Sequence, residues 1–262
     1  MRRIQDFAKH KASGTKISMI TCYDYTSAKI VAGTSADCIL VGDSLAMTMH
    51  GFDSTLPATP ELMAMHTAAV RKGAPEKFIV GDMPFLAHRG SMDRTLEAVS
   101  QIMRAGADSV KIEGIDGSED VIHHLVKSGV PVMGHLGLTP QSVHQLSGYK
   151  VQATSDVGAS KLREDAIQLQ ELGAFAIVLE CVPADLAASV TQSLQIPTIG
   201  IGAGAGCDGQ VLVFQDMLGL NTDFKPKFVR AYLTGADLIQ GAINRYDADV
   251  KSGDFPNEKE RY

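Results

Sequence analysis

Short apolar runs alternate with helical patterns along almost the whole chain, and this alternation is the feature that most constrains the fold. Eight runs, rich in β-branched and other apolar residues, lie at 17–24, 38–44, 77–83, 109–114, 131–138, 175–182, 197–204 and 210–217. Strands that alternate with helices predict a parallel sheet, because each helix carries the chain back to the end where the next strand begins. Eight such units in succession favour a closed (β/α)8 barrel, an α/β fold, over an open doubly wound sheet.

Helical patterns fill most of the intervals between these runs. They lie at 59–73, 91–106, 118–129, 163–173 and 183–194, and several of them end at glycine, which is typical of a helix C-cap. The interval after the seventh run has no clear long helix. Because no Pro/Ser-rich linker or shift in composition divides the series, we expect residues 1–262 to form a single barrel domain.

Composition and charge argue against several functional classes. A hydrophobic fraction of 45% supports a substantial core, and a net charge of −6 without a long basic run argues against nucleic-acid binding or a polybasic membrane surface. The first residues lack the apolar segment of a secretory signal. The four cysteines lie far apart without a CxxC pair, so neither disulfides nor a cysteine zinc site is predicted. We therefore expect a cytosolic globular protein.

Polar residues stand at the carboxyl ends of the apolar runs, where a barrel of this type places its catalytic groups. Two runs end in the same Gly-Asp pair, at Asp43 and Asp82. A strand buried on both faces has no structural need for a terminal carboxylate, whereas a metal or substrate site at the barrel mouth does. The preceding glycines would let a ligand approach the backbone closely. The polar residues at these ends are Asp24, Asp43, Ser44, Asp82, Lys111, Glu113, His135 and Glu180.

These residues also have purely structural interpretations. Asp43 or Asp82 could cap the helix that follows. Lys111 and Glu113, two positions apart on one strand, could form an ion pair without catalytic function. A carboxylate at Glu180 could pair with an arginine elsewhere, and His135 could be a hydrogen-bonded core histidine. The catalytic interpretation fails only if all of these alternatives hold together.

The carboxylates favour a magnesium site. Asp43, Asp82 and Glu113 are hard oxygen donors without a histidine or cysteine cluster beside them, which favours Mg²⁺ over zinc or copper. A 2-oxo acid would suit this site, because its carboxylate and keto oxygen can chelate the ion, which then stabilises an enolate. Lys111 would offset negative charge on the substrate, and Glu180 would remove the proton as general base.

A series of motifs along residues 17–228 resembles the ketopantoate hydroxymethyltransferase family. The motifs include TCYDYTSAK, ILVGDSLAM, HGFDSTLPAT, MRAGADSVKIEG, PVMGHLGLTPQSV, VLECVP and IPTIGIGAG. The resemblance implies a (β/α)8 barrel of the phosphoenolpyruvate/pyruvate group. It also implies transfer of a hydroxymethyl group from 5,10-methylenetetrahydrofolate to 3-methyl-2-oxobutanoate, which gives ketopantoate in pantothenate biosynthesis.

The resemblance also implies site roles and an assembly. The implied metal ligands are Asp43, Asp82 and Glu113, the implied substrate contacts are Asp43, Ser44, Asp82, Lys111 and His135, and the implied proton acceptor is Glu180. One Mg²⁺ per subunit and a homodecamer are implied as well, and the apolar segment 228–243 could serve either the barrel or a subunit contact. Ala46 and Ser147 stand where the family usually has glycine. Neither change alters an implied ligand or base, so we expect activity to be kept.

Two other functions fit parts of the same pattern. The chain could be a Mg²⁺-dependent lyase or aldolase of the same barrel group, but those relatives usually carry a cysteine in a mobile loop, and here KIEG is followed by IDGSED. It could instead be a non-catalytic barrel that binds folate or an anion, although the full set of acidic residues argues against this. Residues 47–58 and 139–156 are the natural candidates for lids over the site.

Overall fold

The computed structural model describes residues 1–146, 148–222 and 226–262, and Ser147 therefore lies outside the described residues. The chain divides into two compact units, Met1–Leu212 and Val213–Tyr262. The prediction that residues 1–262 are one domain stays a prediction. Within these described residues, no helix is both long enough and apolar enough to cross a membrane.

The first unit is a closed barrel of eight parallel strands, which confirms the fold predicted from the sequence. Each strand pairs with the next along the chain, and β8 pairs with β1 to close the barrel. The strands are β1 (Ile17–Thr21), β2 (Cys38–Val41), β3 (Phe78–Asp82), β4 (Ser109–Glu113), β5 (Val132–Gly137), β6 (Ala176–Glu180), β7 (Thr198–Ile201) and β8 (Gly209–Leu212). Every one of them falls within or next to a predicted run.

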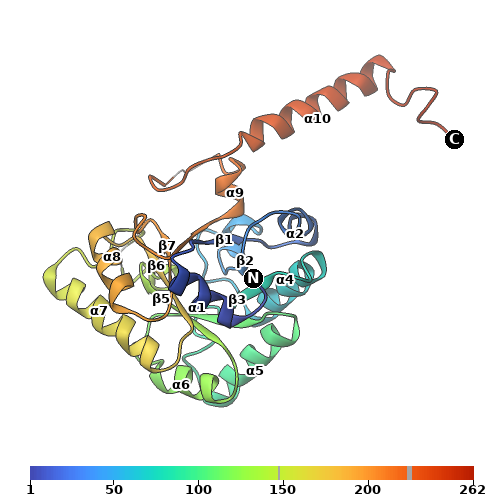
Figure 1. Cartoon of the computed structure of the whole chain (residues 1–262). Helices are drawn as coiled ribbons and strands as arrows, with labels where there is room; N and C mark the ends of the chain where they lie inside the picture. The colour runs from blue at the N-terminus through green and yellow to red at the C-terminus, as the bar shows by residue number, and fades with distance from the viewer. Residues whose placement is uncertain (147, 223–225) are drawn as a thin grey trace. The chain divides into compact units, whose positions relative to one another are not determined.

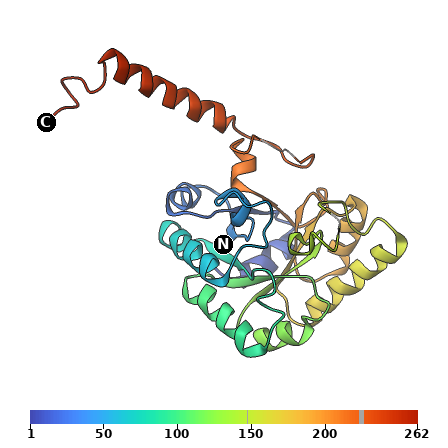
Figure 2. The ribbon, with the colours of Figure 1, turned by 180° about the vertical axis from the view of Figure 1, so that it is seen from behind.

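Helices connect most of the strands, and the longer connecting helices lie around the outside of the barrel (Figures 1 and 2). In this unit they are α1 (Ile4–Ser13), α2 (Tyr25–Ala32), α3 (Leu45–Thr48), α4 (Pro60–Gly73), α5 (Met92–Arg104), α6 (Glu119–Lys127), η1 (Pro140–Ser142), α7 (Asp156–Glu171) and α8 (Ala184–Ser193). The link from β7 to β8 contains no helix, as predicted. Helix α7 begins well before residue 163, because the Ser155 side chain caps it by accepting a hydrogen bond from the Gly158 backbone N–H.

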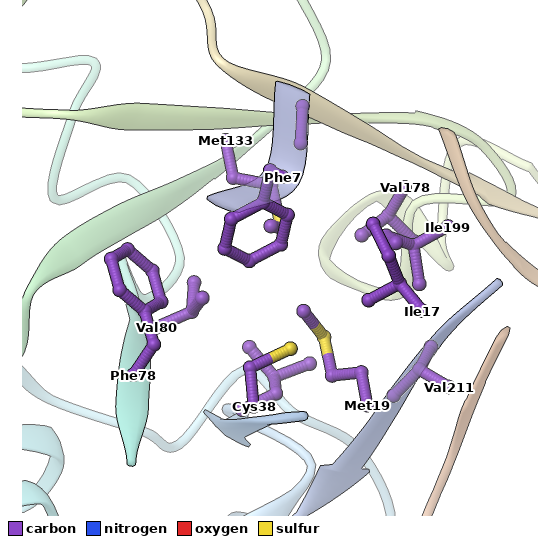
Figure 3. Packing of buried hydrophobic residues seen from close by; sticks show 12 residues of the cluster. Phe7, Ile17, Met19, Cys38, Phe78, Val80, Met133, Val178, Ile199 and Val211 are labelled. Carbon is purple, nitrogen blue, oxygen red and sulfur yellow. The ribbon is translucent and has the colours of Figure 1, made fainter. Parts of the chain in front are cut away.

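The barrel interior is apolar toward the amino ends of the strands, and helix α1 covers it at that end. Phe7 from α1 is fully buried, and its ring centroid lies 5.2 Å from that of Phe78 and 5.0 Å from that of Phe175. Figure 3 shows Phe7 among side chains from separate strands, including Met19, Val80 and Met133. Edge-to-face aromatic pairs and the burial of these rings hold α1 across the amino ends of the strands.

The same inward face of the strands changes from apolar to charged toward the carboxyl ends. On β3, Phe78 and Val80 belong to the apolar cluster, and Asp82 is the next residue on that face. Because strand side chains alternate with a period of two, burial of the first two residues fixes the direction of the third. The corresponding inward charged residues are Lys111 and Glu113 on β4, His135 on β5 and Glu180 on β6.

The second unit contains α9 (Phe214–Met217) and α10 (Gly235–Ser252). The sequence placed an apolar helical segment at 228–243, whereas the helix begins at Gly235 and continues to Ser252. In the same way β8 ends at Leu212 instead of 217, because α9 begins at Phe214. Exposed apolar side chains stand along α10 at Leu238, Ile239, Ile243, Tyr246 and Val250.

Candidate active site

Lys111 and Asp82 form a buried ion pair at the mouth of the barrel. The two residues are register partners on β4 and β3, and Lys111 Nζ lies 2.8 Å from Asp82 Oδ1. The second carboxylate oxygen, Oδ2, accepts a hydrogen bond of 3.0 Å from the Asp43 backbone N–H. Asp82 thus links the tip of β3 to the loop after β2.

His135 lies between two carboxylates. Its Nδ1 is 3.3 Å from Glu113 Oε1, and its Nε2 is 3.2 Å from Glu180 Oε2. Lys111 Nζ also lies 3.0 Å from His135 Nδ1. A chain of polar contacts therefore runs from Asp82 through Lys111 and His135 to Glu180, across four adjacent strands.

Gln141, in the η1 turn after β5, connects this chain of contacts to Asp43. Its Nε2 donates to Asp43 Oδ2 at 2.8 Å and to the Met83 carbonyl at 2.9 Å, while its backbone N–H donates to Glu113 Oε2 at 3.0 Å. The residue is buried. Sequence reasoning missed Gln141 because it considered only strand ends, although the segment 139–156 was expected to lie near the site.

The site holds more carboxylates than cationic groups. Burial, together with the charges of Asp82 and Glu113, raises the pKa of Asp43 well above its usual value. Burial also raises the pKa of Asp82, even though Lys111 opposes this shift. For Glu113, burial is outweighed by the hydrogen bond and charge of His135 and by Lys111, and the pKa is lowered.

The neighbouring carboxylates raise the pKa values of both basic groups of the site. Burial disfavours a charge on Lys111, but the neighbouring carboxylates of Asp82, Glu113 and Asp43 raise its pKa. Burial and Lys111 likewise disfavour charged His135, but its contacts with Glu113 and Glu180 raise its pKa to about 9. Four carboxyl groups, those of Asp43, Asp82, Glu113 and Glu180, thus lie around two basic side chains.

A divalent cation would offset this surplus of negative charge. Within residues 1–146, 148–222 and 226–262, no group of three or more His, Cys, Asp or Glu side chains is arranged to enclose a metal ion. Asp43, Asp82 and Glu113 nevertheless suit Mg²⁺ chemically, because each presents a buried carboxylate and their neighbours leave the cluster short of positive charge. These three residues are the ones that could hold the ion.

The remaining sequence-predicted residues have mixed outcomes. Ser44 lies beside the site, and its Oγ is 2.7 Å from the Tyr23 hydroxyl. Asp24 instead caps α2, where its carboxylate accepts a hydrogen bond of 2.9 Å from the Ser27 backbone N–H. Capping was the structural alternative weighed for strand-end aspartates, and it holds for Asp24 but not for Asp43 or Asp82.

The two glycines that precede the aspartates have different roles, and the explanation given for both is wrong for Gly81. A Cβ added at Gly81 would lie 2.5 Å from Cγ2 of Ile102, which means that this glycine lets α5 pack closely on β3. A Cβ at Gly42 would instead lie 3.0 Å from Ser44 Oγ and 3.4 Å from Asp82 Oδ2, inside the site. Only Gly42 keeps space open next to the acidic cluster.

Comparison with known proteins identifies the family of this chain. The family model for ketopantoate hydroxymethyltransferase matches residues 2–258. The chain belongs to this family.

Family members from bacteria are similar to this chain over all or nearly all of their length. The chain is 56% identical to 3-methyl-2-oxobutanoate hydroxymethyltransferase of Bdellovibrio bacteriovorus, over 100% of both chains. It is 53% identical to the enzyme of that name from Coxiella burnetii, over 96% of this chain and 95% of the relative. The ketopantoate hydroxymethyltransferase relatives thus share the whole barrel and the second unit with this chain.

Solved structures of more distant proteins share the fold. Phosphonopyruvate hydrolase in complex with oxalate and Mg²⁺ has a TM-score of 0.64 at 12% identity, covering 99% of this chain and 93% of its own. A 2,3-dimethylmalate lyase of the PEP mutase/isocitrate lyase superfamily has a TM-score of 0.61 at 14% identity, covering 100% and 92%. At these identities the likeness shows the fold alone, so the ketopantoate hydroxymethyltransferase chain shares its barrel architecture with these proteins.

Proposed function

We propose that this protein transfers a hydroxymethyl group from 5,10-methylenetetrahydrofolate to 3-methyl-2-oxobutanoate and so produces ketopantoate. Membership of the ketopantoate hydroxymethyltransferase family supports the activity. The observation that carries the chemistry is the chain of contacts from Asp82 through Lys111 and His135 to Glu180 at the barrel mouth. It joins a buried cation, suited to an oxo acid, to a carboxylate that could act as a base.

Lys111 is suited to hold the anionic oxo acid. Its charged form is fixed by three neighbouring carboxylates, and a substrate that enters the mouth brings negative charge into contact with the Nζ group. Ser44 would contribute a hydrogen bond beside it, and His135, whose ring nitrogens face Glu113 and Glu180, would position these two carboxylates. Mg²⁺, held by Asp43, Asp82 and Glu113, would supply Lewis-acid stabilisation of the negative charge that develops on the oxo acid.

Glu180 is suited to take the proton from carbon 3 of the oxo acid. Its side chain is 16% exposed, so it is more open than Asp82 or Lys111, while the contact of Oε2 with His135 orients it. Loss of this proton turns carbon 3 into a nucleophile, which forms a carbon–carbon bond to the one-carbon unit of the folate. The bonds from that carbon to the two folate nitrogens break, water supplies the hydroxyl oxygen, and the proton from carbon 3 and one from water leave with tetrahydrofolate. No covalent bond to the protein is needed.

Proton exchange tests this proposal in two separable steps. The wild-type protein with Mg²⁺ should exchange the carbon-3 proton of 3-methyl-2-oxobutanoate with D₂O without folate, as followed by NMR, and should form ketopantoate when 5,10-methylenetetrahydrofolate is added. Glu180→Gln should lower the exchange rate at least a hundredfold. Exchange at the full rate in this variant would remove Glu180 as the base, and exchange without folate-dependent turnover would overturn the transferase assignment.

We further infer that the protein is cytosolic and self-associates. Ile239, Ile243, Tyr246 and Val250 recur at helical spacing on α10, and each is about half exposed, between 46% and 60%. A stripe of this kind is typical of a helix that packs against another copy. The homodecamer implied by the family resemblance is the assembly that we propose.

A further inference from the structure

A hollow beside the barrel mouth belongs to none of the roles described so far. It has a volume of about 730 Å³, within the usual range for small-molecule sites. It extends from the loops after β3, β4 and β5 to the first half of α7. Residues on its wall include Phe85, Leu86, Asp116, Gln141, Lys161 and Asp165.

Gln141 forms the partition between this hollow and the acidic cluster. Its side chain donates to Asp43 Oδ2 and its backbone N–H donates to Glu113 Oε2, yet the residue also lines the hollow. Leu136 and Gly137, at the end of β5, line it as well. A molecule in the hollow would therefore lie next to an oxo acid held by Lys111.

Strained backbone conformations gather around the hollow and the site. Of the described residues other than glycine, those with positive φ are Leu86 at 61°, Ala153 at 54° and Cys181 at 47°. Leu86 and Ala153 line the hollow, and Cys181 follows Glu180. Such conformations are energetically costly and cluster at functional sites. Leu86 is moreover 54% exposed, so packing of its side chain does not account for the strain.

The wall of the hollow combines apolar and acidic surface. Phe85 and Leu86 are exposed on one side, which suits stacking against a flat ring. On the other side Lys161 Nζ lies 2.6 Å from Asp165 Oδ1 and 2.7 Å from Asp116 Oδ1, so one lysine serves two carboxylates. Of these two carboxylates, Asp165 is the less exposed, at 13% against 78%.

We propose that this hollow binds the folate cosubstrate, with its pterin ring against Phe85 and Leu86 and with Asp165 accepting hydrogen bonds from the aminopyrimidinone edge. The inference rests on the proposed function, because it assigns a binding site to the folate, the second reactant of that reaction. The edge of a pterin carries adjacent N–H donors, which match a carboxylate geometrically. The one-carbon unit, attached near the middle of the folate, would then face the partition at Gln141.

Asp165→Asn tests the assignment, with Glu164→Gln as the matched control. Glu164 lies on the same helix, is exposed, does not line the hollow, and accepts a hydrogen bond from Ser160. We expect Asp165→Asn to raise the KM for 5,10-methylenetetrahydrofolate at least tenfold and to leave folate-independent proton exchange within twofold of the wild type. Glu164→Gln should change neither quantity.

Leu86→Gly provides a second variant that should stay folded. Glycine adopts the left-handed conformation without strain, so the melting temperature should be unchanged or higher, while loss of the apolar side chain should raise the KM for the folate. An unchanged KM for the folate in both Asp165→Asn and Leu86→Gly would overturn the proposed folate site. If the wild type exchanges the proton but never uses the folate, the proposed function fails instead.

Discussion

Lys111 Nζ lies 2.8 Å from Asp82 Oδ1, and the two side chains are only 4% and 2% exposed. This pair joins β3 to β4 at the mouth of the barrel and places a cation among three buried carboxylates. Removing one partner of such a pair is far more costly than removing both, because the other charges stay buried without compensation.

Lys111→Met should therefore lower both activity and stability. We expect proton exchange to be lost and the free energy of unfolding at pH 7 to fall by about 3 kcal/mol, measured by urea denaturation. Lys251→Met on α10 is the control, because Lys251 is 73% exposed and its pair with Asp247 should contribute less than about 1 kcal/mol. Equal stabilities of the two variants would contradict this role for Lys111.

Magnesium should stabilise the folded protein through the acidic cluster. Mg²⁺ at about a hundred times its Kd should increase the free energy of unfolding by roughly 2.7 kcal/mol, because it binds the folded state only. Asp43→Asn should abolish most of this gain, and Asp185→Asn on α8 should retain it. A thermal shift in Mg²⁺ that persists in full in Asp43→Asn would remove Asp43 from the metal site.

Gly81→Ala should destabilise the barrel, since its Cβ would meet Ile102 at 2.5 Å. The expected loss is about 1–3 kcal/mol in urea unfolding, the usual cost of overpacking. Gly90→Ala is the matched control, because a Cβ there would have no neighbour within 4 Å. Adding Ile102→Leu, which removes the clashing methyl group, should make the double variant less destabilised than Gly81→Ala alone.

His88 should make stability depend on pH below neutrality. Burial, with a smaller contribution from the charge of Arg89, lowers the pKa of His88 from 6.5 to about 4. The unfolded chain thus binds a proton that the folded chain does not, and stability falls as the pH drops through this window, by on the order of 3 kcal/mol. His88→Gln should show a shallower fall between pH 6.5 and pH 4 in urea unfolding. Parallel pH profiles for the two proteins would contradict this assignment.

The apolar stripe of α10 should mediate self-association. Ile243→Glu places a charge on the stripe and should shift the protein to smaller assemblies in light scattering coupled to size-exclusion chromatography. Arg245→Glu also changes the charge of α10 and serves as the control, with no expected change in size. The idea fails if Ile243→Glu keeps the mass of the wild type.

The barrel was predictable because its strands carry local signals. Phe78, Val80 and Asp82 alternate along one strand face, so the sequence alone indicated both an apolar interior and a charged mouth. The candidate charges at Asp82, Lys111, Glu113, His135 and Glu180 are indeed brought together by the strands. Their catalytic and metal-binding roles stay predictions.

Other features depend on contacts between distant parts of the chain. Gln141 contacts Asp43, 98 positions away, and nothing in the turn around Gln141 signals that partner. The packing of Gly81 against Ile102 likewise appears only once α5 lies on β3. Helix α1 carried no recognisable core pattern, because Phe7 is its only buried residue.

The burial of Phe7 has a consequence for how substrates reach the active site. Because Phe7 packs against Phe78 and Phe175, the interior of the barrel is closed at the amino ends of the strands. Both reactants must enter, and the product must leave, through the mouth at the carboxyl ends of the strands. A folate bound in the hollow beside this mouth would narrow the route, so we expect the oxo acid to bind before the folate.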